Sequence, residues 1–164
     1  IRLMVMGRIK RGGTGCYCAE GSLLQALLAH LLIARNEVVI LDMEAGIEHL
    51  GRATAQAVDK LIVVVEPGRR SLETAHRISQ LGQDIGLPNI AVVGNKIRSQ
   101  SDREFLLASL PGFEFLGFIP YDQALVDADQ ANLPLLDSSQ PIVVAVKDIY
   151  RALLSSVENK IKVK

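Results

Sequence analysis

Asp42 and Gly46 are the residues whose types and spacing are best suited to phosphate chemistry. Asp42 ends an apolar run, Val-Val-Ile-Leu at residues 38–41, and Gly46 follows four residues later. A carboxylate at a strand end can hold the water ligands of Mg²⁺, and a glycine N–H can approach a γ-phosphate because it has no Cβ. We therefore predict a catalytic role for Asp42 and phosphate binding by Gly46. The alternative is that Asp42 caps a helix or lies in a solvent-facing loop.

A second candidate site follows the run Ala-Val-Val-Gly-Asn-Lys at residues 91–96. The amide of Asn95 can pair with the edge of a purine, and Lys96 beside it is a further candidate for cofactor binding. A GTPase has an aspartate two residues after such a lysine. Here that position is Arg98, which cannot accept hydrogen bonds from guanine, so adenine is favoured. The alternative is that Asn95 caps the next helix.

A third strand end carries Phe-Ile-Pro-Tyr-Asp at residues 118–122. The turn from Pro120 to Asp122 can place backbone groups beside a base. We therefore include Pro120 and Asp122 among the predicted cofactor-binding residues.

Cys16 and Cys18 are the only cysteines and lie one residue apart. This spacing disfavours an internal disulfide, because the closed ring would be small and strained. Two thiolates are fewer than the four of a closed zinc site, but a two-fold dimer supplies four. Sulfur ligands suit zinc, an iron–sulfur cluster or square-planar nickel. We predict metal binding by this pair at a homodimer interface, the alternative being two thiols with no metal.

Alternating strand and helix patterns position these residues. The apolar runs predict strands at 2–6, 37–42, 60–65, 89–94 and 114–118, and helices at 21–34, 71–85, 101–110, 121–129 and 141–157. We expect Ser71 to cap its helix and residues 86–88 to end it. Short connections between alternating elements predict an α/β fold of three layers, a mostly parallel sheet with helices on both faces.

The composition limits the classes of function. The chain has 164 residues, with 18 basic and 18 acidic side chains, which fits one globular domain and gives no sign of nucleic-acid binding. No apolar run is long enough for a membrane helix, so we expect a soluble protein with no membrane partner. Cysteine usage fits a reducing cytoplasm.

The phosphate loop that usually accompanies such strand ends is missing. No G-x-x-x-x-G-K-[ST] motif occurs, and residues 7–13 have its glycine spacing but Gly13 in place of the lysine. The sequence begins at Ile1, inside an apparent strand and without a methionine. We therefore expect residues 1–164 to be part of a longer protein.

Together these motifs resemble the deviant-Walker P-loop ATPases that include MinD, ParA and nitrogenase iron protein, of the SIMIBI class. The resemblance runs from Asp42 through Asn95 to Asp122. Within that group, the loop Arg-Gly-Gly-Thr-Gly-Cys-Tyr-Cys at residues 11–18 is similar to the CooC-type accessory ATPases, which assist nickel insertion into carbon monoxide dehydrogenase.

The resemblance implies a role for each motif. Asp42 and Gly46 would belong to the second switch, Asn95 and the Pro120 turn would hold the adenine of ATP or ADP bound with Mg²⁺, and the two cysteines would bind Zn²⁺ or Ni²⁺ between subunits. Residues 1–164 would be the C-terminal portion of one ATPase domain, without the phosphate loop and thus inactive alone. Carbon monoxide dehydrogenase would be the client. The alternatives are a non-catalytic metal-binding or dimerisation module and an iron-protein-like electron-transfer ATPase.

Overall fold

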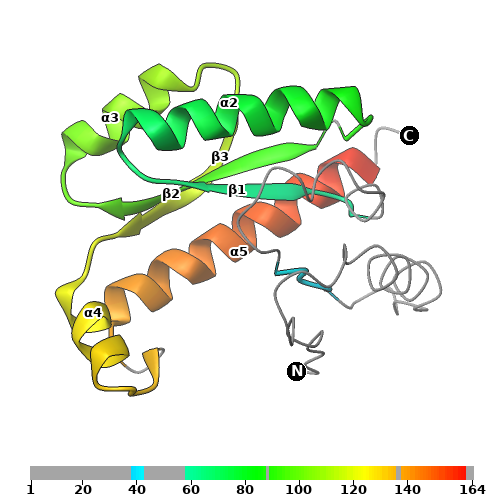
Figure 1. The fold of residues 1–164 in the computed structure, drawn as a ribbon. Coiled ribbons are helices and arrows are strands. Elements are labelled where there is room, and N and C mark those ends of the chain that lie inside the picture. Colours follow the sequence, from blue (N-terminus) through cyan, green and yellow to red (C-terminus); the bar gives the residue numbers. More distant parts are fainter. Residues whose placement is uncertain (1–37, 43–57, 88, 136–137, 162–164) are drawn as a thin grey trace, which may run out of the picture. The chain divides into compact units, whose positions relative to one another are not determined.

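The computed structural model describes residues 38–42, 58–87, 89–135 and 138–161 (Figure 1). The chain divides into two compact units, residues 1–58 and 59–164. In the first unit, the described run 38–42 carries Asp42. All helices and strands given below belong to the second unit.

The second unit is built on a parallel sheet of three described strands. These are β1 (Leu61–Val65), β2 (Ile90–Ile97) and β3 (Glu114–Pro120), in the order β1-β2-β3. Val63 of β1 is aligned with Val92 of β2, which is aligned in turn with Phe115 of β3. Runs of β-branched residues without polar alternation are typical of parallel strands that are covered on both faces.

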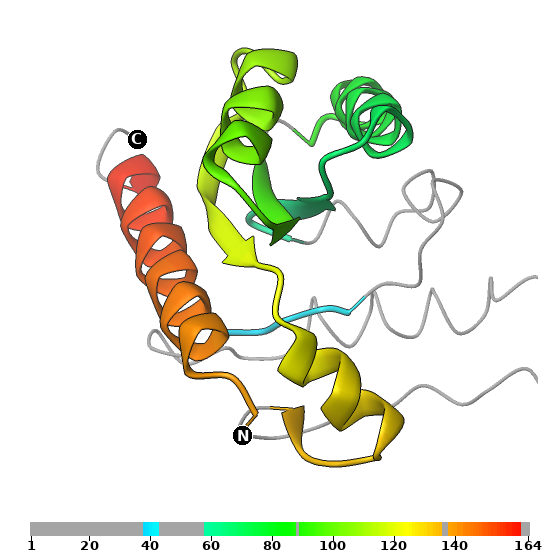
Figure 2. The same ribbon diagram turned by 90° about the vertical axis from the view of Figure 1, so that its left-hand side faces the viewer.

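Helices cover both faces of this sheet, as Figure 2 shows. On one face lie α2 (Arg69–Asp84) and α3 (Gln100–Ser109), and on the other lies α5 (Gln140–Ile161), while the short α4 (Gln123–Gln130) follows β3. The predicted three-layer α/β architecture is confirmed. Among the described residues, no helix is both long and apolar enough to cross a membrane.

Two apolar clusters join the layers. The cluster under α2 and α3 contains the buried Val65, Val92 and Leu106, and the cluster under α5 contains Val93 and Leu116 with part-buried helix residues packed on them. Burial of each large apolar side chain contributes roughly 1.5–3 kcal/mol relative to exposure. The sheet is therefore a rigid base for the loops at its ends.

The helix α2 begins differently from the prediction. Its N-cap is Gly68, and the hydroxyl of Ser71 instead accepts a hydrogen bond of 2.9 Å from the N–H of Glu66. The predicted cap at Ser71 is wrong because this hydroxyl serves the turn after β1. The C-terminal end of α2 agrees with the prediction that residues 86–88 end the helix. Gly86 has a φ of +73°, and the N–H of Leu87 donates back to the carbonyl of Gly82 at 2.7 Å.

The strand predicted at 37–42 is not found in the described residues 38–42, which have no regular secondary structure. Val38, Val39 and Ile40 are 48%, 47% and 85% exposed, where a buried strand was expected. A parallel strand needs a neighbour to complete its hydrogen bonds. The sheet of described strands contains β1, β2 and β3 and does not include residues 38–42. The apolar composition of this run was therefore not sufficient to form a strand.

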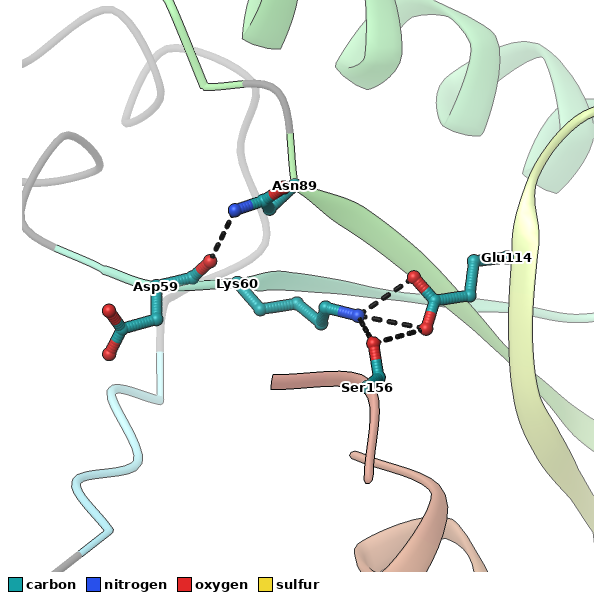
Figure 3. Close-up of polar contacts among 5 residues, drawn as sticks. All are labelled: Asp59, Lys60, Asn89, Glu114 and Ser156. Atoms are coloured by element: carbon teal, nitrogen blue, oxygen red, sulfur yellow. Dashed lines mark hydrogen bonds and ion pairs between the residues drawn. The ribbon is translucent and has the colours of Figure 1, made fainter. Parts of the chain in front are cut away.

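A polar cluster ties the amino end of the sheet to α5 (Figure 3). Lys60, just before β1, places its Nζ 2.9 and 2.7 Å from the carboxylate oxygens of Glu114, and it also donates to the hydroxyl of Ser156. That hydroxyl lies 2.5 Å from Oε1 of Glu114. Asn89 donates to the carbonyl of Asp59 at 3.1 Å. These contacts join both outer strands and α5 at the edge opposite the predicted site.

Candidate functional site

The fold brings together the predicted residues on β2 and β3. Asn95 and Lys96 lie near the carboxyl end of β2, and Pro120 ends the neighbouring β3. Ile97 is aligned with Pro120, and the N–H of Tyr121 donates to the carbonyl of Ile97 at 2.9 Å. Ligands of open α/β sheets bind beyond the carboxyl ends of the strands. We call this region, residues 94–98 and 120–123, the strand-end site.

The end of β2 is irregular, and this irregularity sets the direction of its last side chains. The pairing with β3 shifts between Gly94 and Ile97, and Lys96 has a φ of +55°. Such bulges re-aim side chains next to functional sites. Asn95 is half-buried, whereas Lys96 is exposed and its Nζ lies 2.8 Å from Oε1 of Glu66 after β1. That ion pair lies in solvent and adds little stability.

Gly94 allows β2 and β3 to pack closely just before this bulge. A Cβ added at Gly94 would lie 2.5 Å from Cδ1 of Phe118 and 3.1 Å from a methyl group of Leu106. Only a residue without a side chain fits between these groups, which are held by β3 and α3. The glycine thereby fixes the position of the backbone that carries Asn95.

Asn95 is not the cap of the following helix. The N-cap of α3 is Ser99, whose hydroxyl accepts from the N–H of Asp102 at 3.2 Å, while the carboxylate of Asp102 accepts from the N–H of Ser99 at 3.1 Å. This reciprocal pair is a capping box. The helix-cap alternative for Asn95 is therefore wrong, and its nucleotide-binding role stays a prediction.

Asp122 anchors the turn after β3 to two helices. Its Oδ1 accepts from the N–H of Ala124 at 2.9 Å, which makes it the N-cap of α4, and its Oδ2 accepts from the hydroxyl of Ser139. Ser139 is buried, and its hydroxyl in turn accepts from the N–H of Ile142 in α5. These donors lower the pKa of Asp122, the Ser139 hydroxyl having the larger effect. The carboxylate thus has a structural role that sequence reasoning missed.

Arg98 and Tyr121 form a contact across the site. The guanidinium carbon of Arg98 lies 3.8 Å from the centre of the Tyr121 ring, within the range of a cation–π interaction. The hydroxyl of Tyr121 donates to Oε1 of Gln123 at 2.5 Å. Sequence reasoning used Arg98 only as a residue that cannot accept hydrogen bonds, and it gave no role to Tyr121. No spacing rule predicts a contact between residues on two different strand ends.

The other predicted residues belong to the first unit, residues 1–58. Asp42 is exposed and belongs to the first unit. Gly46, Cys16 and Cys18 lie outside the described residues, so their roles stay predictions. Within the described ranges, no group of three or more histidine, cysteine, aspartate or glutamate side chains could hold a metal ion.

Comparison with known proteins gives close relatives. No family model matches the chain. It is 44% identical over 161 residues to the carbon monoxide dehydrogenase accessory protein CooC of Rhodospirillum rubrum, a match that covers 98% of this chain and 60% of that protein. It is 47% identical over 142 residues to an uncharacterised ATP-binding protein of Methanocaldococcus jannaschii, covering 84% and 55% of the two chains. The chain thus spans less than two thirds of the length of these relatives.

The comparison with solved structures agrees with the comparison of sequences. The cell division protein MinD of Aquifex aeolicus superposes with a TM-score of 0.54 at 27% identity, covering 64% of this chain and 48% of that one. The MinC:MinD complex of the same organism gives 0.53 at 28% identity, covering 61% and 44%. The chain therefore has a MinD-like α/β fold of the P-loop NTPase type, and over nearly its whole length its sequence resembles the CooC-type accessory ATPases of the MinD/ParA family.

Proposed function

We propose that residues 1–164 form the C-terminal portion of an ATP-binding accessory protein that assists nickel insertion into carbon monoxide dehydrogenase. The observation that carries this proposal is the convergence of Asn95 and the Pro120 turn at one sheet edge, in a chain similar to CooC along 98% of its length. Asn95 has an amide that can both donate to and accept from adenine. The turn supplies backbone groups for the remaining edge of the base.

The outer strand β1 is the place where we propose that a further strand of the domain pairs. Ile62 and Val64 are 38% and 57% exposed, although their aligned neighbours on β2, Ala91 and Val93, are buried. Among the described strands, β1 has a partner on one side only. Parallel strands are normally covered on both faces. We propose that a phosphate-loop strand outside this sequence pairs with the edge of β1 that no described strand occupies.

In that domain the remaining residues take the roles that their chemistry allows. Asp42 is proposed to organise Mg²⁺, and Gly46 to approach the γ-phosphate. Cys16 and Cys18 from each of two subunits would together supply four thiolates for Zn²⁺ or Ni²⁺. ATP binding that rearranges the dimer would then change metal affinity, and metal would change ATP affinity by the same factor.

The proposal is tested by calorimetric titration of the intact protein with ATP and Mg²⁺, with and without one metal ion per dimer. Metal content and mass in solution are measured on the same samples. Submicromolar to micromolar ATP binding that changes with metal is expected, and a Cys16→Ala/Cys18→Ala variant should bind ATP but lose both the metal and its effect. Identical ATP binding with and without metal would refute the proposed coupling. No ATP binding at all would refute the proposed nucleotide site.

A non-catalytic module is the second candidate, because Cys16 and Cys18 of two chains could together supply four metal ligands without a nucleotide. It differs from the first proposal in one measurable respect. Such a module would bind metal through the cysteines and dimerise, but the intact protein would show neither ATP binding nor ATP hydrolysis.

A further inference from the structure

We infer that Arg98 and Tyr121 act as a positioning pair, which fixes the side-chain orientation of the turn after β3 relative to the end of β2 and thereby sets the affinity and base preference of the site. This inference rests on the proposed nucleotide binding. It adds two residues that contact each other across the strand-end site and that the comparisons and the motifs leave without a role.

The pair joins the two elements that carry the base-binding candidates. Arg98 follows the bulge of β2 that presents Asn95, and Tyr121 stands between Pro120 and Asp122 in the turn after β3. The 3.8 Å separation of guanidinium and ring is short enough for stacking of the two planes. Any movement of the turn away from β2 would separate them.

Each residue of the pair also has a contact with the helix that follows it. The N–H of Arg98 donates to Oδ2 of Asp102 at 2.8 Å, so its backbone is fixed to the capping box of α3. The Tyr121 hydroxyl donates to Gln123, whose amide nitrogen donates to Asp127 at 2.8 Å within α4. The Arg98–Tyr121 contact therefore joins a residue whose backbone N–H is bonded to α3 to a residue whose side chain is bonded to α4.

Backbone contacts hold the turn without the pair, so its removal should leave the fold intact. The N–H of Tyr121 bonds to the carbonyl of Ile97, and Asp122 caps α4. These bonds fix the backbone on both sides of the ring. The stack adds restraint on the side-chain orientation of the turn, which matters for ligand affinity because a preorganised site loses less entropy on binding.

The chemistry of Arg98 also bears on the choice of base. A guanidinium has donors only, and the stack keeps it beside the strand-end site. The N1 atom is an acceptor in adenine and carries an N–H donor in guanine, although guanine also has acceptors at O6 and N7. An unpaired donor facing another donor is costly once water is excluded. A guanidinium of Arg98 that faces N1 of the base would therefore disfavour GTP relative to ATP.

The test is a set of ATP and GTP titrations on the intact protein with Arg98→Ala, Tyr121→Leu, the double variant and Tyr121→Phe. Arg151→Ala is the matched control, because Arg151 lies on α5 and pairs with Asp148 in solvent. We expect each of the first two variants to weaken ATP binding roughly threefold to tenfold. Arg98→Ala should also lower the preference for ATP over GTP. Tyr121→Phe should weaken ATP binding less than Tyr121→Leu, because it keeps the ring and loses only the hydrogen bond to Gln123, and the Arg151→Ala control should behave as wild type.

The double variant decides whether the two residues act as one unit. If they do, it should bind ATP no more weakly than the worse single variant, since the first substitution already removes the contact. Thermal unfolding should be unchanged by Arg98→Ala. Wild-type ATP affinity in both single variants, or fully additive losses in the double variant, would overturn the inference while leaving the nucleotide site in place. A wild-type protein that binds no nucleotide would instead overturn the proposed function.

Discussion

Replacing Glu114 by alanine should destabilise the fold more than replacing Lys60 by methionine. The two charges form one ion pair, but the Lys60 side chain is only 4% exposed and that of Glu114 is 40% exposed. Without the carboxylate, the Lys60 ammonium loses both of its bonds to Glu114 and keeps the Ser156 hydroxyl as its partner in the cluster. Without the ammonium, the carboxylate still reaches water and the same hydroxyl.

The magnitudes follow from this asymmetry. An uncompensated buried charge costs about 3–5 kcal/mol, and the remaining hydroxyl places Glu114→Ala near the low end, at about 3 kcal/mol of unfolding free energy. Lys60→Met keeps the apolar stem and removes only hydrogen bonds to groups that can be rehydrated, so about 1 kcal/mol is expected. The double variant should cost less than the sum, because it leaves no unpaired charge.

The assay is urea unfolding of the chain followed by far-ultraviolet circular dichroism, with wild type and the three variants at neutral pH. We expect Glu114→Ala to be the least stable of the three variants. The double variant and Lys60→Met should both be more stable than Glu114→Ala. A Lys60→Met variant less stable than Glu114→Ala would refute it, as would additive effects in the double variant.

Three further predictions test local features of the same fold. Ser99→Ala should lower the free energy of unfolding by about 1 kcal/mol through loss of the capping box, whereas Asn95→Ala should leave it within about 0.5 kcal/mol because Asn95 caps no helix. Gly94→Ala should cost about 1–3 kcal/mol in denaturant unfolding, since its Cβ would approach a phenyl carbon to 2.5 Å. Gly68→Ala has nothing within 4 Å and should cost less, because it loses only the preference for glycine over alanine at the N-cap of α2. The pKa of Asp122 is lower in the folded state than in the unfolded state, where it is about 3.9. The ionised side chain therefore stabilises the fold above about pH 3.9, and this stabilisation is lost as the pH falls through the folded-state pKa. The stability difference between wild type and Asp122→Asn should therefore shrink below about pH 4 in acid unfolding curves, and a difference that grows there would contradict this assignment.

The sequence was sufficient to predict the layers of the fold, because strands that are buried on both faces have a clear pattern of consecutive apolar residues. Runs such as that at residues 61–65 are apolar throughout and mostly β-branched, and turn residues separate them from the helices. The strand ends were less predictable. β2 was expected to end at Gly94 but continues to Ile97 through a bulge, because pairing with β3 resumes beyond the shift in register.

Two local predictions failed because each depended on groups outside its own segment. Ser71 has the right type and position for an N-cap, but its hydroxyl accepts from Glu66 in the preceding turn. Residues 38–42 have the composition of a buried strand, and composition alone cannot supply the neighbour that a parallel strand requires. Both outcomes depend on tertiary context that a single segment does not contain.

The candidate site was predictable in position but not in its internal contacts. Asn95, Lys96 and Pro120 were found because each follows an apolar run, and parallel strands bring such positions to one edge. The capping role of Asp122 and the stacking of Arg98 on Tyr121 depend on side-chain positions set by α4, α5 and the bulge. Sequence spacing does not contain that information.

The central claim is that the carboxyl edge of the β1–β3 sheet binds an adenine nucleotide, and backbone NMR tests it most directly. The isotope-labelled intact protein is titrated with ATP and Mg²⁺, and amide shifts are followed residue by residue. The account predicts saturable shifts at residues 94–98 and 120–123, with little change around Lys60 and Glu114 at the opposite edge. Saturable shifts confined to the opposite edge, or no shifts at all, would contradict it.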